Sequence, residues 1–334
     1  MEKVRWGVLG VAKIATEKVI PAMQQGKLSE VTAIASRDES KAKTAANELG
    51  IPKSYGSYEA MLADPEIDAV YNPLPNHLHV PWSIKALEAG KHVLCEKPIA
   101  LTAEEVDALI AARDKTGLMV EEAFMVRHHP QWIKVKEVVQ SGEIGKVQAM
   151  QCFFSYFNMD PDNVRNMADI GGGGLLDIGC YPINLSRFVF SKEPRRVNAL
   201  VEFDPNFKTD RLASAMLDFG EGVHTTFTCS TQLSLYQRFV FVGDKGRLEV
   251  EIPINALPGQ AMRLMIDPGA DLTGTGRKML EVASCDQYTL QGDDFSALIQ
   301  GRGNNPTTLE DARKNMQVID AIFRSGKSGQ WEQP

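Results

Sequence analysis

The feature that most constrains the fold is an alternation, through about residue 120, of short apolar runs with longer amphipathic stretches. The apolar runs predict strands at residues 5–9, 31–35, 69–72, 92–95 and 118–120. The intervening stretches predict helices at residues 12–25, 41–48, 58–63, 81–89 and 102–115. Gly50, Gly90 and Gly117 follow three of these helices, where glycine readily adopts the left-handed conformation that ends a helix. Because strands that alternate with helices form βαβ units, this part is expected to be an α/β domain with a parallel sheet.

The pattern changes after about residue 147, where longer β-like runs replace the alternation. Strands are predicted at residues 147–156, 196–203, 213–219, 223–231, 237–242 and 247–251, with a hairpin at residues 243–246. Residues 257–276, rich in Gly and Pro, predict an irregular loop. A final helix is predicted at about residues 307–325, with Thr307 and Glu310 spaced as a capping box and Gly326 as its stop. A chain of 334 residues suggests two domains, placed here at residues 1–122 and 123–334.

Composition excludes several classes of protein. The chain has 36 Lys plus Arg against 43 Asp plus Glu, a net charge of −7, so a nucleic-acid backbone would be repelled. The five cysteines are widely spaced and never form a CxxC motif, which argues against a disulfide framework or a zinc site. His128 and His129 are adjacent and cannot face one site from a helix, so no metal is expected. No export signal or membrane-spanning apolar run is present, and a cytoplasmic location is expected.

The first predicted strand ends in an altered dinucleotide-binding fingerprint. Its three small residues are Gly10, Ala12 and Ala15, and Lys13 and Ile14 lie in the first turn of the helix that follows. Such a turn lets the backbone approach a pyrophosphate and directs helix N–H groups at it. The alternative interpretation is a turn of small residues that packs a helix onto a sheet.

The end of the second strand bears on which dinucleotide would bind. An acidic residue there contacts the ribose 2′-hydroxyl of NAD, whereas this chain has Ser36 and Arg37. A hydroxyl and a guanidinium suit a 2′-phosphate, which favours NADP. Asp38, the next residue, keeps NAD open as an alternative.

Two further loops follow the third and fourth strands, at the sheet edge where ligands bind in parallel sheets. The first carries Leu74, Asn76 and His79, and the second carries Glu96 and Lys97. Lys97 is the candidate for chemistry, and the Lys97–Pro98 bond is a candidate cis peptide. Taken singly, the lysine would be a solvated charge and the histidine a residue at a helix start.

The densest motif is a run of four glycines, residues 171–174, followed by a helical pattern with Asp177 and Tyr181. Residues four apart share one helix face, so the carboxylate and the phenol would point into one cleft. An ammonium near the phenol would favour the phenolate, and Lys97 is a candidate for that ammonium. The alternative is an ordinary helix whose aspartate pairs with an arginine.

Five motifs together resemble the Gfo/Idh/MocA oxidoreductases. They lie at residues 10–15, 74–79, 96–98, 122–127 and 171–181, and the resemblance covers nearly the whole chain. It is greatest to the branch of glucose–fructose oxidoreductase, NADP-dependent aldose (xylose) 1-dehydrogenase and dimeric dihydrodiol dehydrogenase. The resemblance implies a Rossmann domain, then an α+β domain with a large, open, mostly antiparallel sheet used for dimer or tetramer contacts. It also implies that Lys97, Asp177 and Tyr181 form the catalytic group.

These observations lead to a set of expected site residues. Those expected to bind NADP are Gly10, Ala12, Lys13, Ile14, Ser36, Arg37, Leu74, Asn76, His79, Glu96, Lys97 and Arg127. Those expected to bind a carbohydrate substrate are Lys97, Arg165, Asp177 and Tyr181. The apolar run at residues 239–242 is expected to contact another subunit.

The expected reaction is oxidation of a cyclic aldose at carbon 1 to the lactone, with Tyr181 accepting the hydroxyl proton. Three alternatives stay open. They are NADPH-dependent reduction of a sugar ketone or osone, oxidation of a trans-dihydrodiol, and a non-catalytic sugar or NADP sensor. The identity of the sugar, the direction of the reaction and the strictness for NADP are not fixed by any motif.

Overall fold

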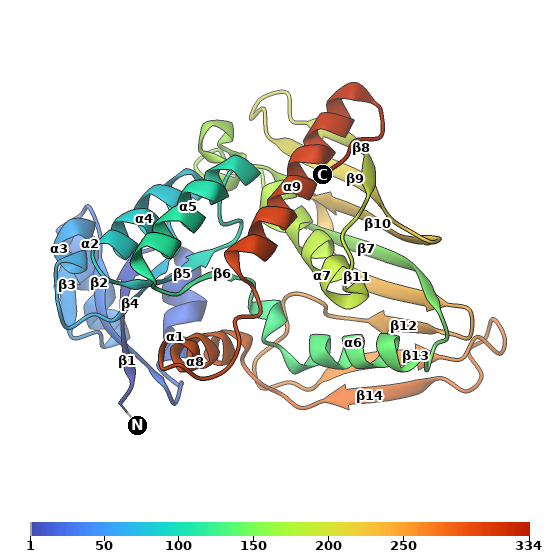
Figure 1. The fold of residues 1–334 in the computed structure, drawn as a ribbon, viewed down its shortest axis with the longest axis horizontal. Coiled ribbons are helices and arrows are strands. Elements are labelled where there is room, and N and C mark those ends of the chain that lie inside the picture. The colour runs from blue at the N-terminus through green and yellow to red at the C-terminus, as the bar shows by residue number, and fades with distance from the viewer. Residues whose placement is uncertain (1) are drawn as a thin grey trace. The chain divides into compact units, whose positions relative to one another are not determined.

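The computed structural model describes residues 2–334, which form two compact units (Figure 1). The first contains Met1–His128 and Asp286–Arg313, and the second contains His129–Cys285 and Lys314–Pro334. Both units are discontinuous in sequence, whereas the expected boundary at residue 122 divides the chain into two continuous segments. The first unit gains residues near the C-terminus because a helix at Gln287–Ile299, not anticipated from the sequence, packs against its first helix.

The first unit is built on a parallel sheet of six strands in the order β3-β2-β1-β4-β5-β6. The strands are β1 (Val4–Leu9), β2 (Ser29–Ala35), β3 (Lys53–Tyr55), β4 (Ala69–Asn72), β5 (His92–Glu96) and β6 (Val120–Ala123). The predicted α/β sheet is confirmed, with the short edge strand β3 added and the last strand shifted toward the C-terminus. The strand order reverses between β1 and β4, and ligands bind outside the carboxyl ends of strands at such a point.

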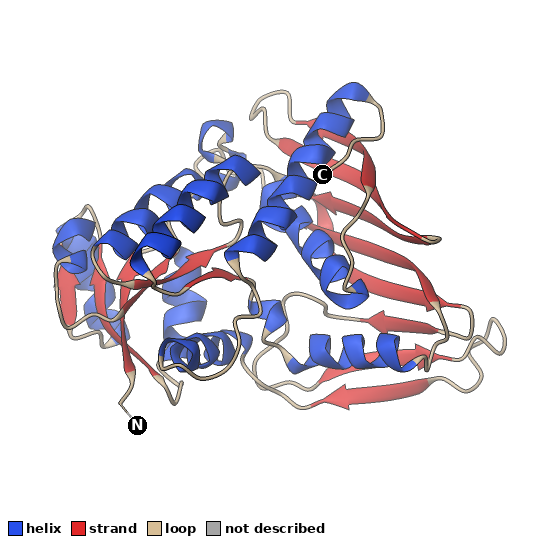
Figure 2. Cartoon of the chain, in the orientation of Figure 1, coloured by secondary structure: helices blue, strands red, loops and turns tan. Residues whose placement is uncertain are grey.

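Helices cover both faces of this sheet, with α4 and α5 on one face and α1 and α8 on the other (Figures 1 and 2). The helices are η1 (Ala15–Val19), α1 (Ile20–Met23), α2 (Glu39–Leu49), α3 (Tyr58–Leu62), α4 (His79–Glu88), α5 (Ala103–Thr116) and α8 (Gln287–Ile299). Trp6 of β1 is fully buried, donates to the Ser296 hydroxyl at 3.1 Å and packs against Phe295. The contact fixes α8 on the sheet. Gly50 and Gly117 end α2 and α5 in the left-handed conformation, as predicted.

The second unit contains a sheet of eight strands in the order β14-β13-β12-β11-β7-β10-β9-β8. The strands are β7 (Val147–Phe157), β8 (Arg196–Phe203), β9 (Asp210–Gly220), β10 (Val223–Ser230), β11 (Gln232–Gly243), β12 (Arg247–Val250), β13 (Met262–Asp267) and β14 (Lys278–Val282). All neighbouring strands run antiparallel except β7 and β10, which are parallel. The predicted mostly antiparallel sheet is therefore confirmed.

The irregular loop predicted at residues 257–276 is wrong in part, because β13 lies inside it. Met262, Leu264 and Ile266 are buried, while Arg263 between them is exposed. This alternation is typical of a strand with one covered face. The flanking glycines and prolines obscured it in the sequence.

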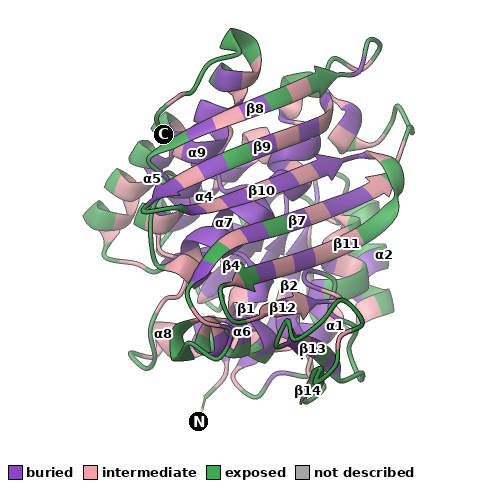
Figure 3. Ribbon diagram, turned by 90° about the vertical axis from the view of Figure 1, so that its right-hand side faces the viewer, coloured by how far each residue is buried: buried purple, intermediate pink, exposed green. Residues whose placement is uncertain are grey.

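The helices α6 (Pro130–Ser141) and α7 (Cys180–Phe190) cover one face of the large sheet. Figure 3 shows the opposite face, with strands β8, β9, β10, β7 and β11 toward the viewer. Phe239 and Phe241 of β11 point to the helical side, where both pack against Trp132 and are fully buried. The expectation that the whole run 239–242 contacts another subunit is therefore wrong for these two residues, since strand side chains alternate between faces.

The final helix, α9, runs from Leu309 to Ser328 and differs from its prediction at both ends. Thr308, rather than Thr307, caps it, because the Thr308 hydroxyl accepts from the Asp311 N–H at 3.2 Å. The Thr307 hydroxyl instead donates to the Glu122 carbonyl at 2.8 Å. Gly326 does not stop the helix. A Cβ there would lie 2.5 Å from the Val201 side chain, so this glycine allows close packing on β8.

Candidate active site

The turn after β1 has the geometry that a dinucleotide fingerprint requires. Gly10 has a φ of +93°, and a Cβ there would lie 3.0 Å from Leu74 Cδ2, in the loop after β4. The Gly10 N–H donates to the Ala35 carbonyl at 2.8 Å, which joins the ends of β1 and β2. Lys13 and Ile14 begin the following helix, as expected. The loops after β1 and β4 thus meet at the carboxyl edge of the sheet.

The residues after β2 distinguish between the two dinucleotides. Asp38 caps α2, because its carboxylate accepts from the N–H groups of Ser40 and Lys41 and from the Ser40 hydroxyl. Arg37 is exposed and close enough to the Tyr58 phenol to influence it. Burial raises the pKa of Tyr58, and the Arg37 charge opposes that rise. The Arg37 guanidinium therefore faces the carboxyl edge of the sheet, whereas the Asp38 carboxylate is bound to the first N–H groups of α2.

His79 lies where a ligand contact was expected, but its ring holds two loops together. Its side chain is 1% exposed, and its ring nitrogens lie 2.7 Å from the Pro98 carbonyl and 2.6 Å from the Leu74 carbonyl. Burial lowers the pKa of His79 to about 4. The buried Asn72 amide donates to the His79 carbonyl and accepts from the Leu74 N–H. Asn72, an unusual residue for a buried strand, therefore helps His79 to hold the loop that contains Leu74.

Glu96 and Lys97 continue this edge after β5. The Tyr71 hydroxyl donates to Glu96 Oε1 at 2.7 Å, and the Lys97 N–H donates to Glu96 Oε2 at 3.2 Å. Burial, followed by the Glu96 charge, raises the pKa of Tyr288 on α8. The Lys97–Pro98 peptide is cis, as expected from the sequence. Lys97 is thus held at a turn whose flanking backbone is bound on both sides.

Arg127 is tied within the first unit. Its Nη2 donates to the Pro306 carbonyl at 2.6 Å, and its Nη1 lies 3.4 Å from the Asp311 carboxylate. Its side chain is largely buried. These contacts give Arg127 a structural role in addition to the cofactor contact that the sequence predicts.

In the second unit, Asp177 is the centre of a polar cluster. The Tyr156 hydroxyl donates to Asp177 Oδ2 at 2.6 Å, and Arg165 Nε donates to the same oxygen at 2.9 Å. The Asp177 charge raises the pKa of Arg165, and burial, followed by the Asp177 charge, raises the pKa of Tyr156. Tyr156 was not predicted, because it looks like an ordinary aromatic residue at the end of β7. Arg165 was predicted to bind substrate, and here it also holds the carboxylate.

Tyr181 lies one helical turn beyond Asp177. Its side chain is buried at 4% exposure, its ring centroid is 6.0 Å from that of Phe154, and its charged form would interact with Arg165. Residues Leu175–Gly179, which include Asp177, form a π-helical turn, and the helix continues as α7 from Cys180. Such turns occur frequently at functional sites. Asp177, Arg165 and Tyr181 are thus brought together within one unit.

Asp210, at the start of β9, anchors the N-terminal end of this helix. Its carboxylate accepts from the Leu175 N–H at 2.6 Å and from the Gly174 N–H. Burial outweighs these donors and raises the pKa of Asp210 to about 7. Gly173 has a φ of +123°, and a Cβ there would lie 2.0 Å from Asp210 Oδ1. The glycine run is therefore needed for the approach of this carboxylate.

Lys97 belongs to the first unit, whereas Asp177 and Tyr181 belong to the second. The predicted catalytic group is therefore divided between the two units. The backbone contacts that hold the turn around Lys97 lie within the first unit. The contacts of Asp177 with Tyr156 and Arg165 lie within the second unit.

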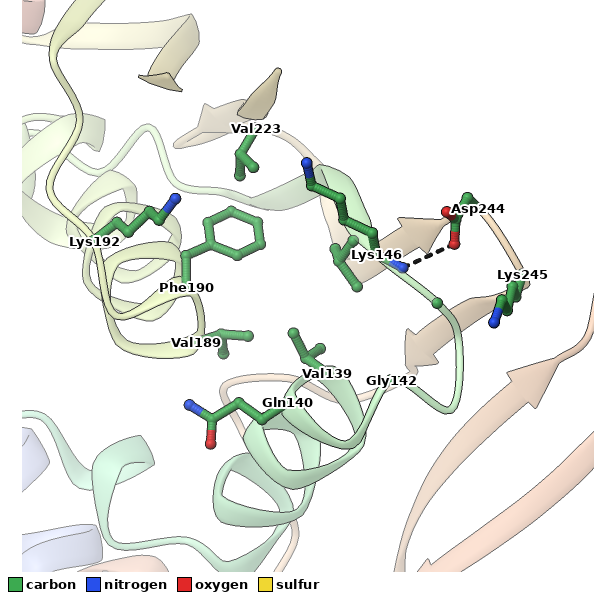
Figure 4. Close-up of a pocket in the computed structure, with 12 residues that line it drawn as sticks. Val139, Gln140, Gly142, Lys146, Val189, Phe190, Lys192, Val223, Asp244 and Lys245 are labelled. Carbon is green, nitrogen blue, oxygen red and sulfur yellow. Dashed lines mark hydrogen bonds between the residues drawn. The ribbon is translucent and has the colours of Figure 1, made fainter. Parts of the chain in front are cut away.

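A separate cavity of about 540 Å³ opens in the second unit, near the C-terminal ends of α6 and α7 (Figure 4). Its lining includes Phe190, Lys192 and Lys146, whose backbone N–H donates to Asp244 at 2.8 Å. None of the predicted site residues lines it. Residues 2–334 contain no group of three or more His, Cys, Asp or Glu side chains that could hold a metal ion. Within the same residues, no helix has the length and apolar character needed to cross a membrane.

Comparison with sequence families gives two matches that follow the two parts of the chain. Residues 4–124 match a family described as "Oxidoreductase family, NAD-binding Rossmann fold", and residues 132–249 match the "GFO/IDH/MocA C-terminal domain". A protein of Rhizobium meliloti, named as the uncharacterized oxidoreductase ORF334, is 49% identical over 332 residues, which is 99% of each chain.

Two further relatives carry more specific names. The D-xylose 1-dehydrogenase (NADP(+)) 2 of Haloferax volcanii is 36% identical over 97% of this chain and 98% of its own. A 3-ketoreductase from Actinomadura kijaniata, solved in complex with NADP and TDP-benzene, superposes with a TM-score of 0.91. It is 30% identical, and the match covers 97% of this chain and 98% of the ketoreductase.

Proposed function

Because the chain belongs to the Gfo/Idh/MocA family of oxidoreductases, we propose that it oxidises a cyclic aldose at carbon 1 to the lactone, with transfer of a hydride to NADP. Family membership makes the chain an oxidoreductase that uses a nicotinamide dinucleotide and confirms the resemblance found in the sequence. The observation that carries the proposal is that the Asp177 carboxylate, bound by Tyr156 and Arg165, lies one helical turn before the Tyr181 phenol.

NADP fits the residues at the carboxyl edge of the first sheet. The Gly10 turn leaves room that a Cβ would fill, and Leu74 bounds that room. Arg37 is exposed beside it, where a guanidinium can pair with a 2′-phosphate, while the Asp38 carboxylate caps α2. When bound, NADP accepts or supplies the hydride. Lys13, Ile14, Ser36, Asn76 and Glu96 are proposed as further contacts from the same edge.

The proton of the reaction is assigned to Tyr181. A phenol is a weak base at neutral pH, and a nearby cation makes its deprotonated form more accessible. Arg165 is a cation that interacts with Tyr181 within the second unit, and Lys97 is the second cation that we assign. Tyr181 then accepts the proton of the anomeric hydroxyl, while Asp177, held through Oδ2 by Tyr156 and Arg165, orients the sugar.

Substitution of Tyr181 tests this assignment. General base catalysis typically contributes 10²–10⁴-fold, so Tyr181→Phe should lower kcat by about that factor. Binding of NADP, measured by fluorescence titration, should be unchanged. Tyr236→Phe, at a tyrosine of β11 that is 46% exposed, is the matched control and should keep full activity. Full activity in Tyr181→Phe would remove this residue from the mechanism.

A second candidate is reduction of a sugar ketone, in which Tyr181 donates rather than accepts the proton. It is favoured by the likeness to the 3-ketoreductase, whose structure contains NADP and TDP-benzene. A kinetic panel decides between the two. It pairs aldopentoses and aldohexoses with oxidised cofactor, and sugar ketones, osones and dTDP-linked keto sugars with NADPH. Trans-dihydrodiols form a third arm, and absence of turnover in every arm would favour a sensor.

We also propose that the enzyme is a cytoplasmic homodimer or homotetramer. Its five cysteines, all among the residues that the structure describes, form no disulfide, as suits a reducing compartment. Large apolar side chains are exposed on the strands and strand ends of the second sheet, including Leu200 at 79%, Leu235 at 74% and Phe157 at 68%. Light scattering of the purified protein should give a mass of two or four chains, and Leu200→Asp should shift it toward the monomer. A monomeric mass for the unsubstituted protein would contradict the proposal.

A further inference from the structure

We propose that Cys285 is a reactive thiol, activated by His129, that forms mixed disulfides with small-molecule disulfides. Cys285 and His129 both belong to the second unit and are not among the residues assigned to the candidate active site. Their contact joins the first and the last residue of the long segment His129–Cys285. The inference does not depend on the proposed function.

The position of the proton on the His129 ring follows from its contact with the Gln131 N–H. His129 is the residue before α6, and its Nδ1 accepts from the Gln131 N–H at 3.0 Å. A neutral imidazole that accepts at Nδ1 carries its proton on Nε2. Nε2 lies 3.4 Å from Cys285 Sγ, so the Nε2–H donates to the sulfur.

This donor favours the reactive form of the thiol. A hydrogen bond to sulfur stabilises the negatively charged thiolate more than the neutral thiol, and the thiolate is the nucleophile. The His129 ring is buried, with its residue at 1% exposure, and its other nitrogen is bound to the backbone of α6. The donor is therefore fixed in direction.

The other four cysteines differ from Cys285 in accessibility. Cys95, Cys152, Cys180 and Cys229 are buried, whereas Cys285 is partly exposed. Burial raises the pKa of Cys95, Cys152 and Cys229, which disfavours their thiolates. The same chain thus supplies four slow thiols as internal references for one fast thiol.

The reaction is thiol–disulfide exchange. The Cys285 thiolate attacks one sulfur of the small-molecule disulfide, a new S–S bond forms, and the original S–S bond breaks. The departing thiolate takes up a proton equivalent to the one that Cys285 released. The products are the mixed disulfide and one small-molecule thiol, and the disulfide itself is the oxidant. Cys285 immediately precedes Asp286, the N-cap of α8, so the adduct stands where the chain leaves the second unit.

The experiment follows the release of aromatic thiol when the full-length protein meets an excess of an aromatic disulfide reagent at pH 7. One equivalent per chain should react in a fast phase, and four should react only on unfolding. Mass spectrometry should locate the fast adduct at Cys285, and Cys285→Ser should abolish the phase. In His129→Asn, the side-chain oxygen can still cap α6, but the N–H donor to sulfur is lost. This variant should slow the fast phase about tenfold, equivalent to one unit in pKa.

A second measurement keeps the role of His129 testable even if His129→Asn unfolds. Between pH 8 and pH 6, the rate for an ordinary thiol with a pKa of about 8.5 falls by nearly a hundredfold. If His129 favours the Cys285 thiolate by one unit in pKa, the rate at Cys285 in the unsubstituted protein should fall by only about 25-fold, with glutathione as the reference thiol. No fast phase, or a fast phase that persists in Cys285→Ser, overturns the proposed site. A fall as steep as that of glutathione, or an unchanged rate in folded His129→Asn, overturns the activation.

Discussion

Removal of the Tyr156 hydroxyl is the most direct test of the Asp177 cluster. In Tyr156→Phe the ring remains, but Asp177 Oδ2 loses its donor at 2.6 Å while the contact with Arg165 Nε at 2.9 Å is kept. A hydrogen bond to a charged group contributes about 1.5–3 kcal/mol, and a short bond to a carboxylate belongs to the stronger kind. We therefore expect a loss of about 2 kcal/mol in the free energy of unfolding of the second unit.

The loss should appear both in stability and in kinetics. For a unit of this size, about 2 kcal/mol corresponds to a fall in Tm of roughly 4–8 °C, measured by calorimetry. If Asp177 orients the sugar, a more loosely held carboxylate should raise KM for the sugar by up to about tenfold. The affinity for NADP, assigned to the first unit, should not change.

Tyr236→Phe again provides the control, since it removes the same hydroxyl from a half-exposed tyrosine of the same sheet. Its Tm and KM should match those of the unsubstituted protein. If Tyr156→Phe shifts Tm by less than about 1 °C and leaves KM unchanged, the hydroxyl does not hold Asp177. The reasoning about the cluster would then be wrong even if the enzyme oxidises a sugar.

Three further predictions test other parts of the structure. Arg37→Ser should lower the preference for NADP over NAD by about tenfold or more in kcat/KM, and an unchanged ratio would place the 2′-phosphate elsewhere. Gly173→Ala should cost at least ~2 kcal/mol more than Gly142→Ala in urea unfolding. Both glycines have positive φ, but only the first would bring a Cβ into contact with a neighbour, and equal costs would contradict this. His128 is buried between two carboxylates at 2.8 Å, which outweigh burial and raise its pKa to about 9. The stability from its charge, up to about 3 kcal/mol, should be complete below pH 6.5 and be lost as the pH rises through 9. The stability difference from His128→Gln should shrink over that range, and a constant difference would refute the assignment.

Most strands and helices of the first sheet could be predicted because their signals are local. The strands predicted there are short apolar runs, and Gly50 and Gly117 end their helices in the expected left-handed conformation. The region after residue 250 could not be predicted equally well. The strand β13 lies between segments rich in Gly and Pro, and α8 packs against Trp6 of β1, which is 290 positions before Ser296 in the chain.

The candidate site could also be predicted only in part from the sequence. The resemblance to a family singles out Asp177 and Tyr181, but no local pattern indicates that Tyr156 and Arg165 both hold Asp177. The contact with Tyr156 spans 21 positions and depends on the way β7 ends beside the helix. Arg165 was assigned to the substrate, and the alternative that Asp177 pairs with an arginine describes a contact that is also present. A salt bridge and a substrate contact are therefore not exclusive interpretations here.

The glycine run before Asp177 makes a buried contact that the sequence does not indicate. Four glycines suggest a backbone that passes close to a ligand, yet the space beside Gly173 is filled by the Asp210 carboxylate from β9. That carboxylate binds the first N–H groups of the helix, so the glycines allow the large sheet to anchor the segment that carries Asp177 and Tyr181. Because the anchor comes from residue 210, it has no signature near the glycines. The position of Asp177 and Tyr181 thus depends on a buried contact that only the folded sheet creates.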